Sequence, residues 1–435
     1  MSENNLNSLI VGLDIGTTKV CAIVGQMNEY GKINILGVGS HPSLGGVMRG
    51  EVTNITKTVE AIRHAVAKAS SISNVQINAV HVGIAGEHIR SFQQNGVKIR
   101  ENSESEITAK ELEDMNKEQF RIVVDAGSKI LHALPQEYNI DDRFPTKEPI
   151  GMQGTKLECK YHIVTGRVSA AKTIVKCVEN AGLIANDVIV EPIASAHAVL
   201  SEEEINSGIA IIDIGGGTTD IAIFHDGKIR HTAVIPYGGE IITADIVDAF
   251  KIIEKQAELV KVKHGHATPQ GARTNTVISV KGIGDRKPKE IVERNLAHVI
   301  HARMKEILEM VNEEIKLSGY QNKLNLGVVL TGGGAQLKDL SNLASYVLGC
   351  EVKIGLPDPH LGKGLVEEVK SPMYATCIGL VLKGFKDLDI NLIKPENKTK
   401  PVKVTSIEGK NKLFGFIGSF KQWIKDDSDT EDYSK

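Results

Sequence analysis

The sequence predicts an α/β protein made of two duplicated lobes around a cleft, and three observations support this. An apolar strand that ends in Asp-Ile-Gly occurs twice, at residues 9–19 and at residues 208–220. Each copy is followed by two further strand patterns, a pair of glycines and a helical pattern. The chain has 435 residues, which is too long for a single hydrophobic core.

The duplicated turns have residue types that suit a phosphate group. Gly215, Gly216 and Gly217 allow a sharp turn and a close approach of the backbone to a ligand. Successive N–H groups in such a turn can surround a phosphate. Asp213 at the strand end could hold a hydrated metal ion that neutralises this phosphate. A triple-glycine turn can also be a plain tight turn, and it is the repetition that favours the ligand site.

Composition excludes several classes of protein. Hydrophobic residues make up 41% of the chain and charged residues 24%, as in a soluble globular protein. The net charge of −3 argues against a nucleic-acid partner. The five cysteines have no metal-ligand spacing, so we expect buried thiols. No apolar stretch reaches the roughly 20 residues that span a bilayer.

Between the two copies, residues 87–166 have the pattern of a small inserted α+β subdomain. A capping box at Thr108 and Glu111 predicts the start of a helix. Apolar and polar residues alternate along 156–163, which predicts a half-buried strand. Nothing in this stretch has the arrangement of a catalytic site, so we expect an interaction module.

Two further segments are candidates for the cleft. Glu191 follows a predicted strand over 187–190 and precedes Pro192, which can occupy the first turn of a helix. A carboxylate at such a junction can contact a metal-bound water, or it can simply be a helix-start acid. A third glycine turn, 331–335, follows a buried strand and leaves room for a flat ring or a ribose.

The end of the chain has a different pattern. Residues 387–412 lose periodicity and predict a flexible linker. Residues 413–425 then place large apolar side chains three or four apart, beside lysines, as in an interfacial membrane helix. The predicted membrane-binding residues are Phe414, Phe416, Ile417, Phe420, Trp423 and Ile424. A helix docked on the core is the alternative, and the long linker makes it the weaker one.

These pieces, in this order, resemble the actin, chaperone and sugar-kinase ATPase superfamily, and within it the FtsA family of bacterial division proteins. The two Asp-Ile-Gly turns match the phosphate loops of the superfamily, and 331–335 matches its adenosine loop. Residues 191–197 and 374–383 match its two connecting helices. The resemblance covers about residues 9–386 and the C-terminal helix, and it implies an actin-like ATPase fold.

The resemblance also implies a ligand set, with ATP between the lobes and Mg²⁺ beside its phosphates. Asp14 and Asp213 would hold the metal, mostly through water, and Glu191 or Asp213 would orient the attacking water. The implied nucleotide-binding residues are Gly16, Thr17, Thr18, Lys19, Gly215, Gly216, Gly217, Thr218, Thr219, Gly332, Gly333 and Gly334. No strong base is evident, so we expect slow hydrolysis with ATP acting mainly as a conformational ligand.

The resemblance divides the chain into subdomains. Those that we expect are a first lobe core (1–86, 167–207 and 357–386), the insert (87–166), a second lobe core (208–248 and 322–356), a helical subdomain (249–321), the linker (387–412), the amphipathic helix (413–425) and an acidic tail (426–435).

The resemblance further implies partners at the division septum. The C-terminal tail of FtsZ would dock on the helical subdomain, where Arg294 and Arg303 could meet an acidic peptide. Self-association into actin-like filaments, other division proteins and the cytoplasmic face of the membrane complete the expected contacts. The alternative is a sugar kinase of the same superfamily, which would need an acidic base in a sugar pocket and leaves the aromatic C-terminal helix without a purpose.

Overall fold

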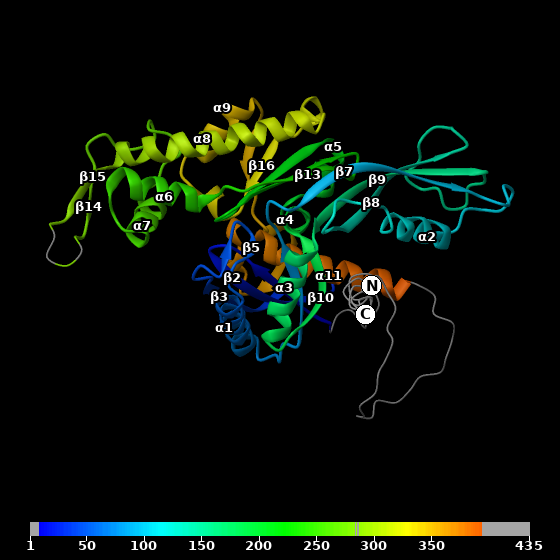
Figure 1. Cartoon of the computed structure of the whole chain (residues 1–435), viewed down its shortest axis with the longest axis horizontal. Helices are drawn as coiled ribbons and strands as arrows, with labels where there is room; N and C mark the ends of the chain where they lie inside the picture. Colours follow the sequence, from blue (N-terminus) through cyan, green and yellow to red (C-terminus); the bar gives the residue numbers. More distant parts are fainter. Residues whose placement is uncertain (1–7, 283, 285–286, 394–435) are drawn as a thin grey trace, which may run out of the picture.

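The computed structural model describes residues 8–282, 284 and 287–393, and it shows two lobes with an inserted sheet beside them. In Figure 1 the first lobe lies at the lower centre, the second lobe runs along the top and the insert extends to the right. The predicted strand and helix patterns of both lobes are present.

The first lobe is a mixed sheet with the strand order β10-β6-β1-β2-β3-β18. Its strands are β1 (Leu9–Ile15), β2 (Lys19–Met27), β3 (Ile33–Pro42), β6 (Ala79–Ile84), β10 (Ile184–Val190) and β18 (Leu361–Gly364). The central strands are buried along nearly their whole length, which is why they read as continuous apolar runs. β1 pairs antiparallel with β2 and parallel with β6.

The second lobe repeats this topology in the order β13-β12-β11-β16-β17. Its strands are β11 (Ile209–Ile214), β12 (Thr219–His225), β13 (Lys228–Ile235), β16 (Val328–Thr331) and β17 (Val352–Ile354). β11 pairs antiparallel with β12 and parallel with β16, as β1 does with β2 and β6. The predicted duplication is therefore also a duplication of strand pairing.

Helices cover both sheets and connect the lobes. The helices of the first lobe are α1 (Ile55–Ser73), α3 (Val168–Asn180), α4 (Glu191–Val199), α10 (Val366–Val369) and α11 (Ala375–Ile393). Those of the second lobe are α5 (Glu202–Ser207), α6 (Gly239–Phe250), α7 (Glu254–His264), α8 (Glu293–Leu317) and α9 (Leu340–Leu348). α8 runs along the top of Figure 1 and buries nine residues against the rest of the second lobe.

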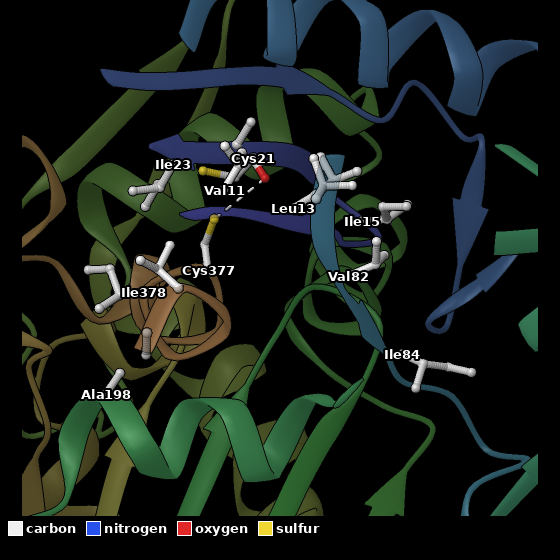
Figure 2. Packing of buried hydrophobic residues seen from close by; sticks show 14 of the residues in the cluster. Val11, Leu13, Ile15, Cys21, Ile23, Val82, Ile84, Ala198, Cys377 and Ile378 are labelled. Atoms are coloured by element: carbon white, nitrogen blue, oxygen red, sulfur yellow. Dashed lines mark hydrogen bonds between the residues drawn. The ribbon is translucent and has the colours of Figure 1, made fainter. Parts of the chain in front are cut away.

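α11 packs so closely on β1 and α4 that only glycine fits at the contacts. A Cβ atom on Gly12 of β1 would lie 2.4 Å from the carbonyl oxygen of Cys377, and one on Gly379 would lie 1.8 Å from that of Ala194. Figure 2 shows the Cys377 thiol of α11 directed at the backbone carbonyl of Cys21 in β2. The small residues of the predicted connecting helix therefore serve a helix–helix contact, as expected from the sequence.

The insert is a three-stranded sheet, ordered β7-β9-β8, with one helix on its face. Its elements are β7 (Arg90–Ile99), α2 (Ala109–Gln119), β8 (Ser128–Ile140) and β9 (Lys156–Arg167). Thr108 and Glu111 form the predicted capping box at the start of α2. Leu157 and Tyr161 of β9 are fully buried beneath this helix, together with Met115.

One polar position of β9 is buried instead of exposed. The alternation predicts that His162 faces solvent, yet the side chain is buried and its Nε2 lies 3.1 Å from Oγ1 of Thr232 in β13. Gln93 of β7 also donates to the backbone carbonyl of Arg230 at 2.9 Å. The insert therefore rests on the second lobe, and a contact between distant segments overrides the local pattern.

Two predicted boundaries differ in the structure. α11 continues to Ile393, past residue 387 where the linker was predicted to begin, because Phe385 and Leu388 still pack on the first-lobe core. The predicted helical subdomain also contains a β-hairpin, β14 (Val277–Val280) with β15 (Lys289–Val292). Each hairpin strand has only four residues, too few for a clear alternating pattern.

The close crossing of α4 and α11 gives a stability prediction for Gly379→Ala. The added methyl would force the two helices apart, so we expect a loss of about 3 kcal/mol in the free energy of unfolding, measured by denaturant titration. Gly333→Ala is the control, because a Cβ there meets nothing within 4 Å. Equal unfolding midpoints for the two variants would contradict the packing described here.

Candidate functional site

The two Asp-Ile-Gly turns are hairpins of equal length and register. Asp14 faces Cys21 in the first hairpin, as Asp213 faces Asp220 in the second. Each turn closes with the same hydrogen bond, from Gly16 N–H to the Lys19 carbonyl at 3.0 Å and from its counterpart Gly215 to Thr218 at 2.9 Å. The structures of the two turns therefore correspond residue by residue.

This register corrects the alignment that the sequence favours. A Thr-Thr pair follows Asp-Ile-Gly in both copies, as Thr17-Thr18 and as Thr218-Thr219, and the sequence favours aligning the two pairs. In the structure Thr17 and Thr18 instead take the places of Gly216 and Gly217. Both turns have the same number of residues between their paired strands, so the two threonine pairs cannot occupy the same places in the two turns.

The tips of the two hairpins lie against each other where the two lobes meet. A Cβ on Gly216 would lie 2.1 Å from Oγ1 of Thr18, and one on Gly217 would lie 2.6 Å from Oγ1 of Thr17. Any side chain at these glycines would collide with the opposite hairpin. The structure thus brings together the two predicted phosphate loops, which are about 200 residues apart in the chain.

Four carboxylates lie at the base of these hairpins. Burial raises the pKa of Asp14 to about 6, opposed by the charge of Lys19 and reinforced by that of Asp213. Burial, with the charge of Asp213, raises the pKa of Asp220 to about 8. Burial and the charges of the other three acids raise the pKa of Glu191 well above its ordinary value. The site therefore gathers more acidic groups than its own basic residues can neutralise, and burial together with their mutual repulsion favours the protonated forms.

Asp213 is held by hydroxyl groups from both connecting helices. Ser195 of α4 donates to its Oδ2 at 2.6 Å, and Thr376 of α11 donates to the same oxygen at 3.1 Å. Burial raises the pKa of Asp213, and these two hydrogen bonds oppose the rise. These hydrogen bonds hold Oδ2 of Asp213 in place. The other carboxylate oxygen, Oδ1, lies next to Gly332, since a Cβ atom on that glycine would be 2.2 Å from it.

The third glycine turn adjoins the second hairpin. Thr331 at the end of β16 is in register with Asp213, and Gly332 follows with a φ of +85°. The N–H of Gly332 donates to the carbonyl of Pro372 at 3.3 Å. Gly334 packs on Ile214, whereas a Cβ on Gly333 would meet nothing within 4 Å. The turn is therefore open on the side of Gly333.

Lys19 reaches the segment that leads into α11. Its ammonium donates to the carbonyl of Met373 at 3.0 Å and lies 3.9 Å from the centroid of the Tyr374 ring. The charge of Lys19 lowers the pKa of Asp14 and of Asp213. The Lys19 ammonium group is therefore close enough to the acids to affect them, while its contacts with Met373 and Tyr374 hold it beside the third turn.

The four carboxylates suit a cation that keeps its water better than a cation bound directly by protein side chains. Within residues 8–282, 284 and 287–393, no group of three His, Cys, Asp or Glu side chains is placed to hold a metal ion. Oδ1 of Asp220 is nevertheless buried without a hydrogen-bond partner, and its Oδ2 accepts from Thr218 at 2.9 Å. Clustered oxygen donors with an unsatisfied carboxylate suit Mg²⁺, which keeps most of its water.

Sequence reasoning missed several residues of this site. Ser195 and Thr376 carry no signal as single hydroxyls within helices, because only the fold brings both to Asp213. Asp220 is the last residue of the second motif copy and pairs with Asp213 across the hairpin. The predicted hairpin could therefore have identified Asp220 as a residue of the site. Ser43 donates to the carbonyl of Gly16 at 2.6 Å, and nothing in its local sequence marks it.

The remaining predicted residues lie away from the cleft or outside the described part. Arg294 is exposed in the first turn of α8. Arg303 on the same helix already donates to Asp245 and to Glu306, at 2.7 and 2.6 Å. The predicted membrane-binding residues at 414–424 lie outside the described residues. Among the helices that are described, none has the length and apolarity needed to cross a bilayer.

Comparison with known proteins identifies the family. The family model "Cell division protein FtsA" matches residues 210–379, and "SHS2 domain inserted in FTSA" matches residues 86–165. The cell division protein FtsA of Pseudomonas aeruginosa is 40% identical over 387 residues, covering 89% of this chain and 91% of the relative. That of Neisseria meningitidis is 39% identical over 415 residues, or 95% and 97%.

Solved structures agree on the fold. The PilM-PilN type IV pilus biogenesis complex superposes with a TM-score of 0.64 at 17% identity, over 86% of this chain and 98% of that one. MreB5 of Spiroplasma citri bound to ADP gives a TM-score of 0.52 at 16% identity, over 90% and 100%. These matches confirm the predicted actin-like fold with its inserted subdomain. The chain belongs to the FtsA family of cell division proteins.

Proposed function

We propose that this chain binds ATP between its lobes and, in that form, links FtsZ filaments to the membrane during cell division. The observation that carries the nucleotide proposal is the contact between two glycine-containing hairpins above a cluster of buried acids. Backbone N–H groups of both turns would surround the phosphates, and the open side of Gly333 would accept the adenosine. Structures with this fold have been solved with ADP and AMPPNP, in MreB5 of Spiroplasma citri.

Asp14 and Asp213 would hold Mg²⁺ through water, with Asp220 as a further oxygen donor. Bound Mg²⁺ supplies positive charge that neutralises the phosphates and the acids beside them. Glu191 or Asp213 would orient the water for hydrolysis. Since Glu191 packs on Gly83 among other acids and its pKa is raised, it is a poor base at neutral pH. This supports slow turnover and a conformational role for ATP.

The adaptor role rests on the family and on the sequence of the tail. Residues 413–425 have the apolar spacing of an interfacial helix, which would bind the cytoplasmic face of the membrane. The tail of FtsZ, an acidic peptide, would dock on the helical subdomain near Arg294. To bind the peptide, Arg303 would have to break its ion pairs with Asp245 and Glu306 and form new ones with carboxylates of the peptide. Further copies of this chain and other division proteins would bind to the membrane-anchored protein at the septum.

Asp14→Asn tests the nucleotide site. Removing one acid of the metal cluster should weaken Mg·ATP binding about tenfold, as measured by calorimetry with and without Mg²⁺. Asp187→Asn is the matched control, because burial also raises the pKa of Asp187 to about 6 but its charged neighbours are Lys383 and Asp387. An unmodified chain that binds no Mg·ATP at millimolar concentration, or equal losses in both variants, would refute the site.

The raised pKa of Asp220 predicts a pH dependence of stability in the absence of metal and nucleotide. The folded-state pKa of about 8 exceeds the ordinary value of 3.8, so the folded protein binds more protons than the unfolded chain between these values. Stability should therefore fall as pH rises from about 4 to about 8. Asp220→Asn should remove part of this fall, so its Tm should exceed that of the unmodified chain most at pH 8.

Asp248→Asn is the control for this titration, because that side chain is 83% exposed. It should leave the pH profile of Tm unchanged. Parallel profiles for Asp220→Asn and the unmodified chain would show that Asp220 is not a source of the pH dependence.

Co-sedimentation with anionic vesicles tests the membrane and FtsZ proposals together. The full chain should pellet with phosphatidylglycerol vesicles and carry FtsZ with it. A chain that ends at Ile393, and a full chain with Phe420→Glu and Trp423→Glu, should both stay in the supernatant, because the apolar face is lost. Sedimentation of the truncated chain would contradict the anchor.

The same assay separates the FtsZ site from the anchor. Arg294→Glu should pellet with vesicles while losing most of the FtsZ, since it reverses an exposed charge. Lys68→Glu on the exposed face of α1 makes the same charge change elsewhere and should retain FtsZ. If Arg294→Glu carries as much FtsZ as the unmodified chain, the docking surface lies elsewhere.

A further inference from the structure

A short hairpin of the first lobe reaches both phosphate loops. It consists of β4 (Val47–Met48) and β5 (Glu51–Val52), joined by Arg49 and Gly50. Both tip residues are left-handed, with φ of +50° for Arg49 and +77° for Gly50. A non-glycine residue in this conformation is held by its surroundings rather than by its own preference.

The tip of this hairpin contacts one loop from each lobe. The N–H of Gly50 donates to Oγ1 of Thr17 at 3.1 Å, in the first hairpin turn. In the second turn, a Cβ on Gly217 would lie 2.9 Å from the backbone of Arg49. A change in the distance between the two loops would therefore have to move residues 49 and 50.

Arg49 brings a positive charge beside the two phosphate loops. Its guanidinium carbon lies 5.6 Å from the centroid of the Tyr237 ring, and Tyr237 in turn accepts a hydrogen bond from Thr219 at the start of β12. Arg49 is exposed, so a ligand can reach its guanidinium beside Tyr237. Lys19, by contrast, is engaged with Met373 and Tyr374 on the side of the third turn.

The base of the hairpin is tied to the start and the end of the insert. Oε2 of Glu51 accepts from Arg167 at 2.9 Å, at the last residue of β9. Oε1 lies 4.0 Å from Nδ1 of the buried His88, two residues before β7 begins. A Cβ on Gly86 would also lie 3.2 Å from Cγ of Glu51. Residues 49–51 thus connect the cleft to both ends of the insert.

We propose that residues 49–51 sense the terminal phosphate of a bound nucleotide and transmit its presence to the insert. Arg49 binds the γ-phosphate of ATP, which ADP lacks, and the resulting shift of the hairpin reaches the insert through Glu51 and Arg167. The proposal rests on nucleotide binding between the lobes and adds a residue that distinguishes the two nucleotides. The insert would then be positioned differently in the ATP and ADP forms.

The first test compares Mg·ATP and Mg·ADP affinity in Arg49→Gln by calorimetry. Glutamine has the same backbone preference as arginine but no charge, so thermal unfolding should be unchanged. We expect ATP to bind about tenfold more weakly and ADP to bind within about twofold of the unmodified chain, as for the loss of one charge-assisted contact. Lys68→Gln, on the exposed face of α1, should alter neither affinity.

The outcomes of this test separate the two proposals. Equal weakening of ATP and ADP, or no weakening of either, would overturn the sensor while leaving nucleotide binding intact. Absence of ATP and ADP binding in the unmodified chain would instead refute the nucleotide site on which the sensor depends.

The second test follows hydrogen exchange of residues 86–90 and 165–169 with each nucleotide. In the unmodified chain these amides should be protected differently by Mg·ATP and Mg·ADP, and Glu51→Gln should abolish the difference while retaining ATP affinity. Glu158→Gln, which removes a carboxylate paired with Lys156 on β9, should preserve it. A difference that survives in Glu51→Gln, or that is absent in the unmodified chain, would overturn the proposed route to the insert.

Discussion

The hydrogen bonds that Ser195 and Thr376 donate to Asp213 are the interaction on which the arrangement of the cleft depends. The acid belongs to the second lobe. One hydroxyl comes from α11, which packs on the first lobe, and the other from α4, which packs on α11 and on strands of both lobes. One carboxylate oxygen therefore connects three elements. Any rotation of the lobes must either carry α4 and α11 with Asp213 or break these bonds, so the relative position of the lobes and the chemistry of the cleft are linked.

The glycines make this arrangement possible by removing side chains where backbones meet. Gly379 allows α4 and α11 to cross, and Gly216 allows the hairpin tips to touch. Close contact forces several acids into one buried region, where desolvation and mutual repulsion favour their protonated forms. A cation or a bound phosphate–metal group would relieve this repulsion. The charge distribution thus supports the proposal that a ligand binds between the lobes.

Much of the fold followed from local pattern. The buried strands β1 and β11 were evident as apolar runs ending in Asp-Ile-Gly, and the capping box at Thr108 identified the start of α2. The errors arose where distant segments meet. His162 is buried because β13 covers it, and α11 continues past residue 387, where Leu388 still packs on the first-lobe core. That Thr17 and Thr18 are equivalent to Gly216 and Gly217 could be seen only from the register of the paired strands.

The sequence by itself determined the duplicated lobes, the inserted subdomain and the acidic, glycine-containing turns, because strand periodicity and turn chemistry are local properties. The family followed from the resemblance of these motifs, in their order, to those of a known family. Only the tertiary structure decided which groups meet at the cleft. The hydrogen bond from Thr376 to Asp213, the contact of Arg49 with Tyr237 and the packing of the insert on β13 all join residues that are far apart in the chain. Such contacts depend on how packed elements are oriented in space, and single hydroxyl, arginine or glutamine residues carry no local signal of that orientation.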